Sequence, residues 1–392
     1  MKKRQARHEG HSKQDAAARP GGWRLASLLD APLVGLMLAI KAVVLVFGAQ
    51  AYVVSSNQSL SSLYERLAIW NRWDAPHYLD IARMGYVAEG LEARWIVFYP
   101  LYPWLVRACA FVLQDELVSA FFVSTLASLA AGLLLYRLAE LDEPEAVARA
   151  SVFFMFIFPT SYFLHIGYTE SLFIALAVGA FLAARVRRWW LAGLLGALAS
   201  LTRINGLLLV PALAFEVLEE YRGEGRRPRR QWLWVAAVGF GFGVYLLINW
   251  KVFGDPRAFL KMQDQYWSKS LTWPWVGITA AWNSTWGRAP SEAQMVGWQE
   301  FFFVLLGLGL TVWSWLRLRT SYAVWMTLNW LLWTSTKFVL SVPRYTLVMF
   351  PAYILLARAC AARPVLQAVV TVWSLLFLAL FAARFVQGHW AF

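Results

Sequence analysis

The chain of 392 residues is 59% hydrophobic and only 15% charged, with a mean hydropathy of +0.49. An average soluble domain is about 25% charged, so this composition excludes a soluble enzyme, a disordered chain and a small secreted domain held by disulfides. The net charge of +13 does not indicate nucleic-acid binding, because no basic face on a soluble fold is visible. Basic loops on the cytoplasmic side of a membrane protein explain it better.

A basic arm precedes the first apolar run. We interpret residues 1–32 as a cytoplasmic arm and residues 33–392 as a single polytopic membrane domain. The first apolar run, Leu33 to Val54, is too long for the core of a cleaved signal peptide and is expected to remain as a membrane span. Cys109 and Cys360 form no CxxC pair, so the sequence predicts neither a disulfide framework nor a zinc site.

Eleven apolar segments are expected to cross the membrane as helices, although several are shorter than the usual ~17–25 residues. They are residues 33–54, 117–138, 148–164, 168–185, 190–203, 206–220, 231–250, 298–316, 321–340, 345–361 and 365–386. The apolar segment 99–113 contains two prolines and an arginine, so we expect it to lie at the membrane interface. The sequence therefore predicts an all-α integral membrane protein with about 11 transmembrane helices and interfacial helices in its first external loop.

The distribution of basic residues supports this topology. With a cytoplasmic N-terminus, more than half of the 36 lysine and arginine residues lie on the cytoplasmic side. If 99–113 crossed the membrane, the basic clusters at 185–188 and 222–230 would lie outside, which the positive-inside rule disfavours. Two long segments, 55–116 and 251–297, are then external. The short loops and the arginine- and alanine-rich composition favour a bacterial plasma membrane over the endoplasmic reticulum.

The first external segment contains the run from Trp70 to Tyr86, in which Asp74 precedes Pro76 and His77. On a helix, Asp74 and His77 would share one face. Asp74 has two interpretations on spacing alone: a cap on the N-terminus of a surface helix, or a carboxylate held at the membrane surface as a general base, with His77 beside it.

Four further polar clusters are predicted to be external. One is aromatic, with Tyr99 and Tyr102 able to anchor at the interface or to contact a lipid phosphate or sugar. The others carry residues that are costly at membrane depth unless they face a polar cavity, and they contain His165 with Glu170, Arg203 with Asn205, and Lys337 with Arg344 and Tyr345. Arg203 could extend to lipid headgroups, or it could bind a phosphate through its planar donor fork.

The position of these clusters separates two classes of function. A transporter would place polar residues at the midplane and show a repeat between its halves, and no convincing repeat is visible. Neither a GxGxxG loop nor a Walker A motif is present, so a nucleotide-binding phosphate loop is not predicted. An external enzyme acting on a lipid phosphate fits better, and a lipid-linked sugar or phospholipid transporter without chemistry is the alternative.

The run Trp73-Asp74-x-x-His77-Tyr78-Leu79-x-Ile81-Ala82-x-x-Gly85-Tyr86 resembles the signature WD-x-x-HF-x-x-IA-x-x-GY of the PIG-V family, the second mannosyltransferases of GPI-anchor assembly and their bacterial relatives. Shorter matches follow in order: 98–103 is similar to FFP-x-x-P, 167–173 to AYSESLF, 202–206 to RSNG, and 343–345 to PRF or PRY. The departures are Tyr78 for Phe and Ile204 for Ser.

The resemblance implies a GT-C glycosyltransferase fold and an inverting transfer of mannose from a polyprenyl-phosphate-mannose donor on the extracytoplasmic side. Asp74 would be the base, with His77 beside it. The expected donor-phosphate or lipid contacts are Arg203, Arg344, Lys337, Tyr99 and Tyr345, and the expected sugar or acceptor contacts are Trp73, Tyr78, His165, Glu170 and Asn205. No cofactor is expected, and a divalent metal is compatible with this site but not required.

The sequence leaves the substrates partly open. A GT-C enzyme that transfers another sugar, such as arabinose or glucose, is an alternative. The acceptor could be a lipoglycan, a phosphatidylinositol mannoside, a GPI precursor or a protein. The expected partners are therefore the lipid-linked donor, a lipid or glycan acceptor and membrane lipids, with no nucleic acid.

Overall fold

The computed structural model describes residues 30–223 and 227–392 and is all-helical over them; within these ranges the β-structure is one isolated antiparallel bridge between Leu271 and Thr336. Most of the predicted cytoplasmic arm, 1–32, and part of the basic cluster at 222–230 lie outside the described residues. The helices are α1 (Ala31–Ser56), α2 (Leu63–Ala68), α3 (Ala75–Met84), α4 (Leu101–Leu113), α5 (Glu116–Ala139), α6 (Glu145–Phe156), α7 (Glu170–Arg185), α8 (Trp189–Thr202), α9 (Leu209–Gly223), α10 (Val238–Phe253), α11 (Ala258–Trp267), α12 (Pro274–Asn283), α13 (Pro290–Glu292), α14 (Gln299–Arg317), α15 (Thr320–Thr334), α16 (Val342–Thr346), α17 (Pro351–Cys360) and α18 (Pro364–Val386).

Five stretches of the described chain are long and apolar enough to cross a membrane, which makes this a multi-pass membrane protein. They are α1, α5, 230–253 ending in α10, 290–317 ending in α14, and α18. Large apolar side chains on α1 and α18, such as Val43 and Leu376, are exposed, as expected for surfaces that face lipid rather than water. The number of eleven spans stays a prediction, because the other apolar helices are shorter.

Helix α7 forms the centre of the bundle. Every residue of α7 is buried except Leu172 and Arg185, because α5 and α8 pack along it and a helix that is apolar all round is stable only inside a protein or membrane. Its N-terminus therefore lies at one end of the bundle interior and its C-terminus at the other.

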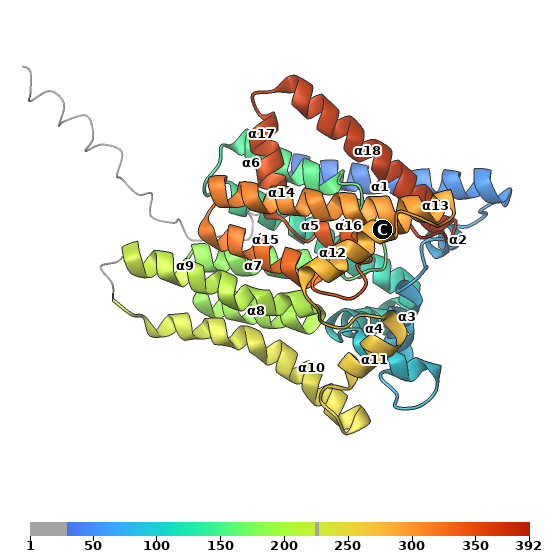
Figure 1. Cartoon of the computed structure of the whole chain (residues 1–392), viewed down its shortest axis with the longest axis horizontal. Helices are drawn as coiled ribbons and strands as arrows, with labels where there is room; N and C mark the ends of the chain where they lie inside the picture. Colours follow the sequence, from blue (N-terminus) through green and yellow to red (C-terminus); the bar gives the residue numbers. More distant parts are fainter. Residues whose placement is uncertain (1–29, 224–226) are drawn as a thin grey trace, which may run out of the picture.

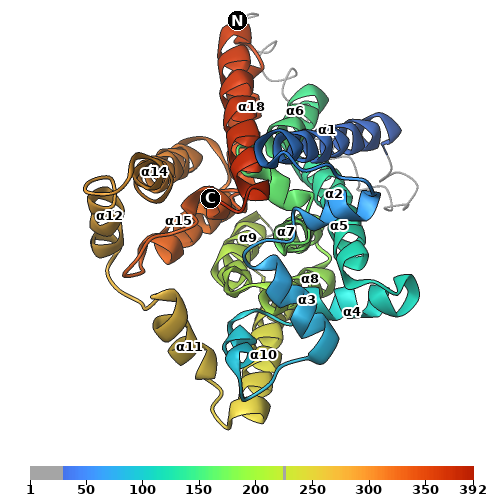
Figure 2. The same ribbon diagram turned by 90° about the vertical axis from the view of Figure 1, so that its right-hand side faces the viewer.

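The two ends of the bundle differ in structure. Figure 1 shows the short helices α3, α4, α11 and α12 gathered at one end, on the right, while the turn between α14 and α15 lies at the other. Figure 2 looks at the first end, where the chain from α10 through α11 and α12 arches across to α14. These short helices belong to the two segments predicted to be external.

All eleven predicted spans contain helix, but in two of them the helix ends early and a third is divided between two helices. The segment 148–164 is helical as α6 only to Phe156, and 321–340 is helical as α15 only to Thr334. The segment 345–361 contains α16 and α17 in place of one helix. Prolines explain two of these breaks, because Pro159 follows α6 and Pro351 starts α17, and proline disrupts a helix interior but fits its first turn.

The segment 99–113 forms a bent unit. Its helix, α4, meets the 3₁₀ turn Leu91–Val97 at an angle of 114°. On α4, Arg107 donates from Nε to the carbonyl oxygen of Ala82 at 2.5 Å and from Nη2 to that of Ile81 at 3.3 Å. These carbonyls belong to the last turn of α3, where Ile81 also accepts from the backbone N–H of Gly85 at 2.9 Å. Arg107 thereby ties α3 to α4, and the interfacial position of α4 stays a prediction.

Candidate functional site

Asp74 does not cap the helix that it precedes. It stands at the start of α3 with helical backbone angles, and its side chain accepts no hydrogen bond from the first turn. Its Oδ2 atom lies 2.6 Å from Nη1 of Arg344 instead. The helix-cap interpretation is therefore wrong, because a capping side chain would have to accept from an N–H of the first turn.

Arg344 joins two carboxylates. Besides Asp74, its Nε atom donates to Oε1 of Glu170 at 2.5 Å. Only 5% of the Arg344 side chain is exposed. Its guanidinium lies over the rings of Phe163 and Tyr168 at 4.8 and 4.7 Å from their centroids. Aromatic faces attract cations, so the rings and both carboxylates stabilise one buried positive charge.

Glu170 binds a second arginine. The same Oε1 atom accepts a hydrogen bond from Nη1 of Arg203, which also donates to Oγ1 of Thr169 at 2.9 Å. Asp74, Arg344, Glu170 and Arg203 thus form a continuous chain of ion pairs, which we call the charge cluster. It unites residues from the starts of α3 and α7, the end of α8 and α16.

Exposure separates the members of the charge cluster. The Glu170 side chain is fully buried, whereas 26% of the Asp74 side chain and 13% of the Arg203 side chain are exposed. Because a sealed carboxylate cannot touch a substrate, Glu170 positions the two arginines. Asp74 and Arg203 are the members that a substrate can reach directly.

The backbone around Asp74 is held from both sides. The Tyr168 hydroxyl donates to the carbonyl oxygen of Arg72 at 2.7 Å and accepts from the backbone N–H of Asp74 at 3.2 Å. Between them, Trp73 adopts a φ of +57°, a left-handed conformation that costs about 1–2 kcal/mol in a residue other than glycine. Backbone strain of this kind persists where surrounding structure enforces it, often at functional sites.

The turn that carries Arg344 is fixed by a buried carboxylate on α14. Both oxygens of Glu300 accept backbone N–H groups at 2.7 Å, one from Ser341 and one from Val342. Ser341 adopts a φ of +73°, and α16 begins directly after it. The sequence offered no sign of this role, because Glu300 lies 41 residues from the turn.

Arg203 is presented by a tight connection between α8 and α9. Gly206 belongs to the stretch similar to RSNG, and a Cβ atom there would lie 2.2 Å from the backbone nitrogen of Ser200, so only glycine fits. Asn205 donates to Oδ1 of Asn329 on α15 at 2.7 Å. Asn205 therefore anchors the connection, and the structure does not bring its amide to the charge cluster.

Tyr345 lies beside the charge cluster, between two cations. Its ring centroid is 5.8 Å from the Arg203 guanidinium and 4.6 Å from Nζ of Lys269. Tyr78 lies below the cluster, with its ring edge-on to Tyr168 at 6.0 Å, and is buried. The structure therefore brings Tyr345 and Tyr78 to the candidate site, together with Lys269, which the sequence did not single out.

His77 is near Asp74 but is not hydrogen-bonded to its carboxylate. The imidazole stacks on Trp95 with 5.1 Å between ring centroids, and its Nδ1 atom is buried with no hydrogen-bond partner. Burial lowers the pKa of His77 below its ordinary value, and the Asp74 carboxylate opposes this shift in part. His77 is therefore a neutral ring at pH 7.

Of the four other predicted site residues, three lie apart from the charge cluster and one, Trp73, lies beside it. Tyr99 stacks on Tyr245 with 4.0 Å between centroids. Lys337 is exposed and pairs with Asp264 at 3.7 Å. The His165 ring is buried against Phe156, while its backbone oxygen accepts a hydrogen bond from Lys41 at 2.7 Å. Trp73 is 38% exposed and packs edge-on against Trp390, which leaves it available at the rim beside Asp74.

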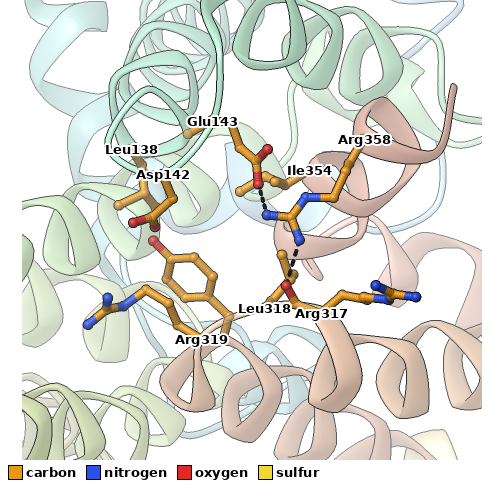
Figure 3. Close-up of a pocket in the computed structure, with 10 residues that line it drawn as sticks. Leu138, Asp142, Glu143, Arg317, Leu318, Arg319, Ile354 and Arg358 are labelled. Atoms are coloured by element: carbon orange, nitrogen blue, oxygen red, sulfur yellow. Dashed lines mark hydrogen bonds and ion pairs between the residues drawn. The ribbon is translucent and has the colours of Figure 1, made fainter. Parts of the chain in front are cut away.

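A separate cavity of about 290 Å³ lies at the other end of the bundle. Figure 3 shows Arg358 pointing toward Glu143 across this cavity, and Arg317 pointing away from it. Nearby, Arg185 forms two hydrogen bonds with Asp142 at 2.6 and 2.7 Å. Because these charges pair with each other, the cavity is a weaker candidate for an anion site than the charge cluster.

Side chains that could bind a metal ion do not cluster in the described part of the chain. Over residues 30–223 and 227–392, no three His, Cys, Asp or Glu side chains lie close enough together to hold a metal ion. Cys109 and Cys360 are free thiols.

Comparison with known proteins gives one family. The family model described as mannosyltransferase (PIG-V) matches residues 42–253. This range contains Asp74, Glu170 and Arg203, whereas Lys269 and Arg344 lie beyond it.

Individual relatives match over shorter stretches. GPI alpha-1,6-mannosyltransferase 2 of Rattus norvegicus is 35% identical over 152 residues, which is 36% of this chain and 30% of that protein. GPI mannosyltransferase 2 of Schizosaccharomyces pombe is 30% identical over 153 residues, 38% of this chain and 32% of that protein. The chain thus spans about a third of the length of these relatives. Among solved structures, the oligosaccharyltransferase of Archaeoglobus fulgidus in complex with Zn and sulfate has a TM-score of 0.47 and 14% identity, over 90% of this chain and 53% of that one.

Proposed function

From the premise that the chain belongs to the PIG-V mannosyltransferase family, we propose that it transfers mannose from a polyprenyl-phosphate-mannose donor to a lipid-linked or glycan acceptor. The observation that carries this proposal is the charge cluster. It places one reachable carboxylate beside two guanidinium groups at a single end of a multi-pass membrane protein.

The proposed reaction is a single inverting displacement with Asp74 as the base. The acceptor hydroxyl oxygen attacks the anomeric carbon of the mannose, and the bond from that carbon to the phosphate oxygen breaks. Asp74 takes the hydroxyl proton, and the bonding electrons leave with the phosphate. A β-linked mannosyl phosphate would give an α-mannoside.

Arg203 and Arg344 provide the charge that such a leaving group needs. A phosphodiester donor carries one negative charge, and the departing polyprenyl phosphate gains a second. Guanidinium groups bind phosphate through paired N–H donors, and fixed cations stabilise developing negative charge most strongly in a site that excludes water. Two arginines can do this without a divalent metal, so we expect transfer to persist in a chelator.

Glu170 makes this arrangement stable in the absence of donor. Two guanidinium groups brought together inside an apolar bundle would repel each other, and Oε1 of Glu170 lies between them. We propose that Glu170 holds both arginines while donor phosphate approaches from the exposed side of Arg203. Arg344 also orients the Asp74 carboxylate through their 2.6 Å contact.

We further propose that the charge cluster faces the extracytoplasmic side of a bacterial plasma membrane, with the N-terminus in the cytoplasm. Labelling of single cysteines tests this after Cys109 and Cys360 are replaced by alanine. Asn57→Cys and Arg188→Cys each introduce one thiol at an exposed position, the first on the proposed external side. An impermeant reagent added to intact cells should label only Asn57→Cys, and labelling of Arg188→Cys would contradict this topology.

The test of the activity is direct. Purified protein in proteoliposomes is incubated with polyprenyl-phosphate-mannose and a lipid extract, and the products are identified by mass spectrometry. The proposal predicts a mannosylated acceptor and free polyprenyl phosphate in equal amounts. Movement of lipid across the bilayer without either product would contradict it and favour a transporter. Efficient transfer from a lipid-linked arabinose or glucose, but not from the mannose donor, would show that the transferred sugar is not mannose.

A further inference from the structure

The second external segment, 251–297, is fixed to the turn that precedes α16. The backbone N–H of Thr272 donates to the carbonyl oxygen of Ser335 at 3.0 Å, and that of Lys337 donates to Ser270 at 3.2 Å. Leu271 and Thr336 form the isolated bridge between these two hydrogen bonds. Because α11 ends at Trp267, this attachment places Lys269 next to α16, and Figure 2 shows the arch of chain that brings it there.

Lys269 approaches the charge cluster through Tyr345. Its Nζ atom donates to the Tyr345 hydroxyl at 2.6 Å and lies 3.4 Å from the carbonyl oxygen of Leu340. The ring of Tyr345 also lies 5.8 Å from the Arg203 guanidinium, and Arg344 is the preceding residue. Three cations from separate parts of the chain therefore surround one end of α16.

Lys269 differs from Lys261 and Lys337 in forming no ion pair with a carboxylate of the described residues, although the buried Glu300 interacts with it electrostatically. Lys261 pairs with Asp255 at 2.8 Å, and Lys337 pairs with Asp264. Over the described residues, no carboxylate pairs with Lys269. An ammonium group has three N–H donors, and the contacts to Tyr345 and Leu340 occupy two of them, so one donor is left for a ligand.

We propose that Lys269 is a third cation of the donor-phosphate site and binds the phosphate oxygens as the polyprenyl phosphate leaves. This inference rests on the proposed transfer. The charge cluster alone holds two carboxylates against two arginines, so its charges balance before a donor arrives. Lys269 adds a cation with a free N–H donor beside this balanced cluster, and the phosphate of either the donor or the product would bind to it.

Equilibrium binding of a fluorescent short-chain polyprenyl phosphate tests the inference without relying on turnover. Loss of one charge-assisted hydrogen bond weakens binding by roughly tenfold or more, so Lys269→Gln should raise the Kd of this phosphate by that factor. Binding of the matching uncharged polyprenol should not change. Lys269→Arg keeps the charge and should retain most of the affinity.

Lys261→Gln is the matched control, since it removes a lysine from the same external segment at an exposed position. It should bind the phosphate as the wild type does. Equal Kd values for wild type and Lys269→Gln would overturn the inference. So would equal weakening of phosphate and polyprenol, or failure of Lys269→Arg to retain affinity, because either result indicates a purely structural role.

The same measurements separate this inference from the proposed function. Phosphate binding that depends on Lys269, in a protein that transfers no sugar, would support the cation and contradict the transferase. Normal mannosyl transfer, together with phosphate binding that does not depend on Lys269, would contradict the role of Lys269 as a phosphate ligand. The proposed transferase activity would then still be supported.

Discussion

The two ends of the bundle both contain arginine–carboxylate pairs, but they match their charges differently. At the cavity end, Arg185, Arg319 and Arg358 face four carboxylates, those of Asp142, Glu143, Glu216 and Glu219. At the other end, Arg203 and Arg344 pair with Asp74 and Glu170, and Lys269 lies beside them with the buried Glu300 as the further acid near it.

Helix α7 makes this comparison direct, because Glu170 begins it and Arg185 ends it. Arg185 pairs with a carboxylate that is 35% exposed, where water weakens the interaction. Glu170 binds two arginines with no exposure at all. At the cavity end the ion pairs link helices, whereas at the other end Lys269, a cation outside any ion pair over the described residues, shares the Tyr345 ring with Arg203, which suits an anion.

Arg344→Ala should have the largest effect on the charge cluster, because it removes the link between Asp74 and Glu170. Loss of a single donor that stabilises a developing negative charge costs about 10²–10³ in turnover. We expect a fall of that size in mannosyl transfer, measured in proteoliposomes. Arg344→Lys should recover part of it, since lysine keeps the charge but loses the planar fork. Full activity of the alanine variant would show that the shared carboxylates are structural only.

Arg203 tests the reachable side of the same cluster. Arg203→Ala should weaken binding of the polyprenyl-phosphate donor by about tenfold or more, and Arg203→Lys should be impaired less. Titration of donor into each purified variant measures this. Identical donor affinities in wild type and both variants would reject Arg203 as a phosphate ligand.

His77 should contribute less, because it does not touch the Asp74 carboxylate. We expect His77→Ala to change turnover only a few-fold. Burial lowers the pKa of His77 below 6.5, so charging this ring opposes folding as the pH falls below 6.5, and its contribution to stability is fully present above that pH. The melting temperature of His77→Ala should therefore fall less than that of the wild type as the pH is lowered below 6.5. If His77→Ala lost more turnover than Asp74→Asn, His77 would be the base and Asp74 would have the supporting role.

Arg358→Ala probes the cavity end of the bundle and should have the smallest effect on turnover. Its side chain is 38% exposed, but its partner Glu143 is only 6% exposed, so the change leaves a largely buried carboxylate without its partner, at a cost of about 1–3 kcal/mol. Thermal unfolding should fall by no more than this, and mannosyl transfer should not change. A loss of turnover without a loss of stability would place a functional site at the cavity.

The sequence predicted the helical segments well because apolar length is a local property. The end of α6 has a local reason in Pro159, but the end of α15 could not be predicted, because the chain after Thr334 pairs with residues 270–272.

The sequence predicted which residues belong to the candidate site, but it did not predict which of them pair with one another. Asp74, Glu170, Arg203 and Arg344 were each selected from separate motifs, yet Glu170 was expected to contact sugar or acceptor, whereas it lies buried between two arginines. Pairs separated by up to 270 residues cannot be read from spacing. Lys337 was preferred because it is close to Arg344 in the chain, but the lysine that reaches α16 is Lys269, which belongs to no motif.

The most direct test of the central claim is single-turnover mannosyl transfer by Asp74→Asn. Asparagine keeps the shape of the side chain but cannot accept the proton, and Arg203 remains to bind donor. The account predicts a fall of about 10²–10⁴-fold in the rate of transfer with donor binding retained. Asp80→Asn, the same change at a half-buried position on the same helix, should be active. A folded Asp74→Asn protein that transfers mannose at a near-normal rate would contradict the claim that this carboxylate is the base.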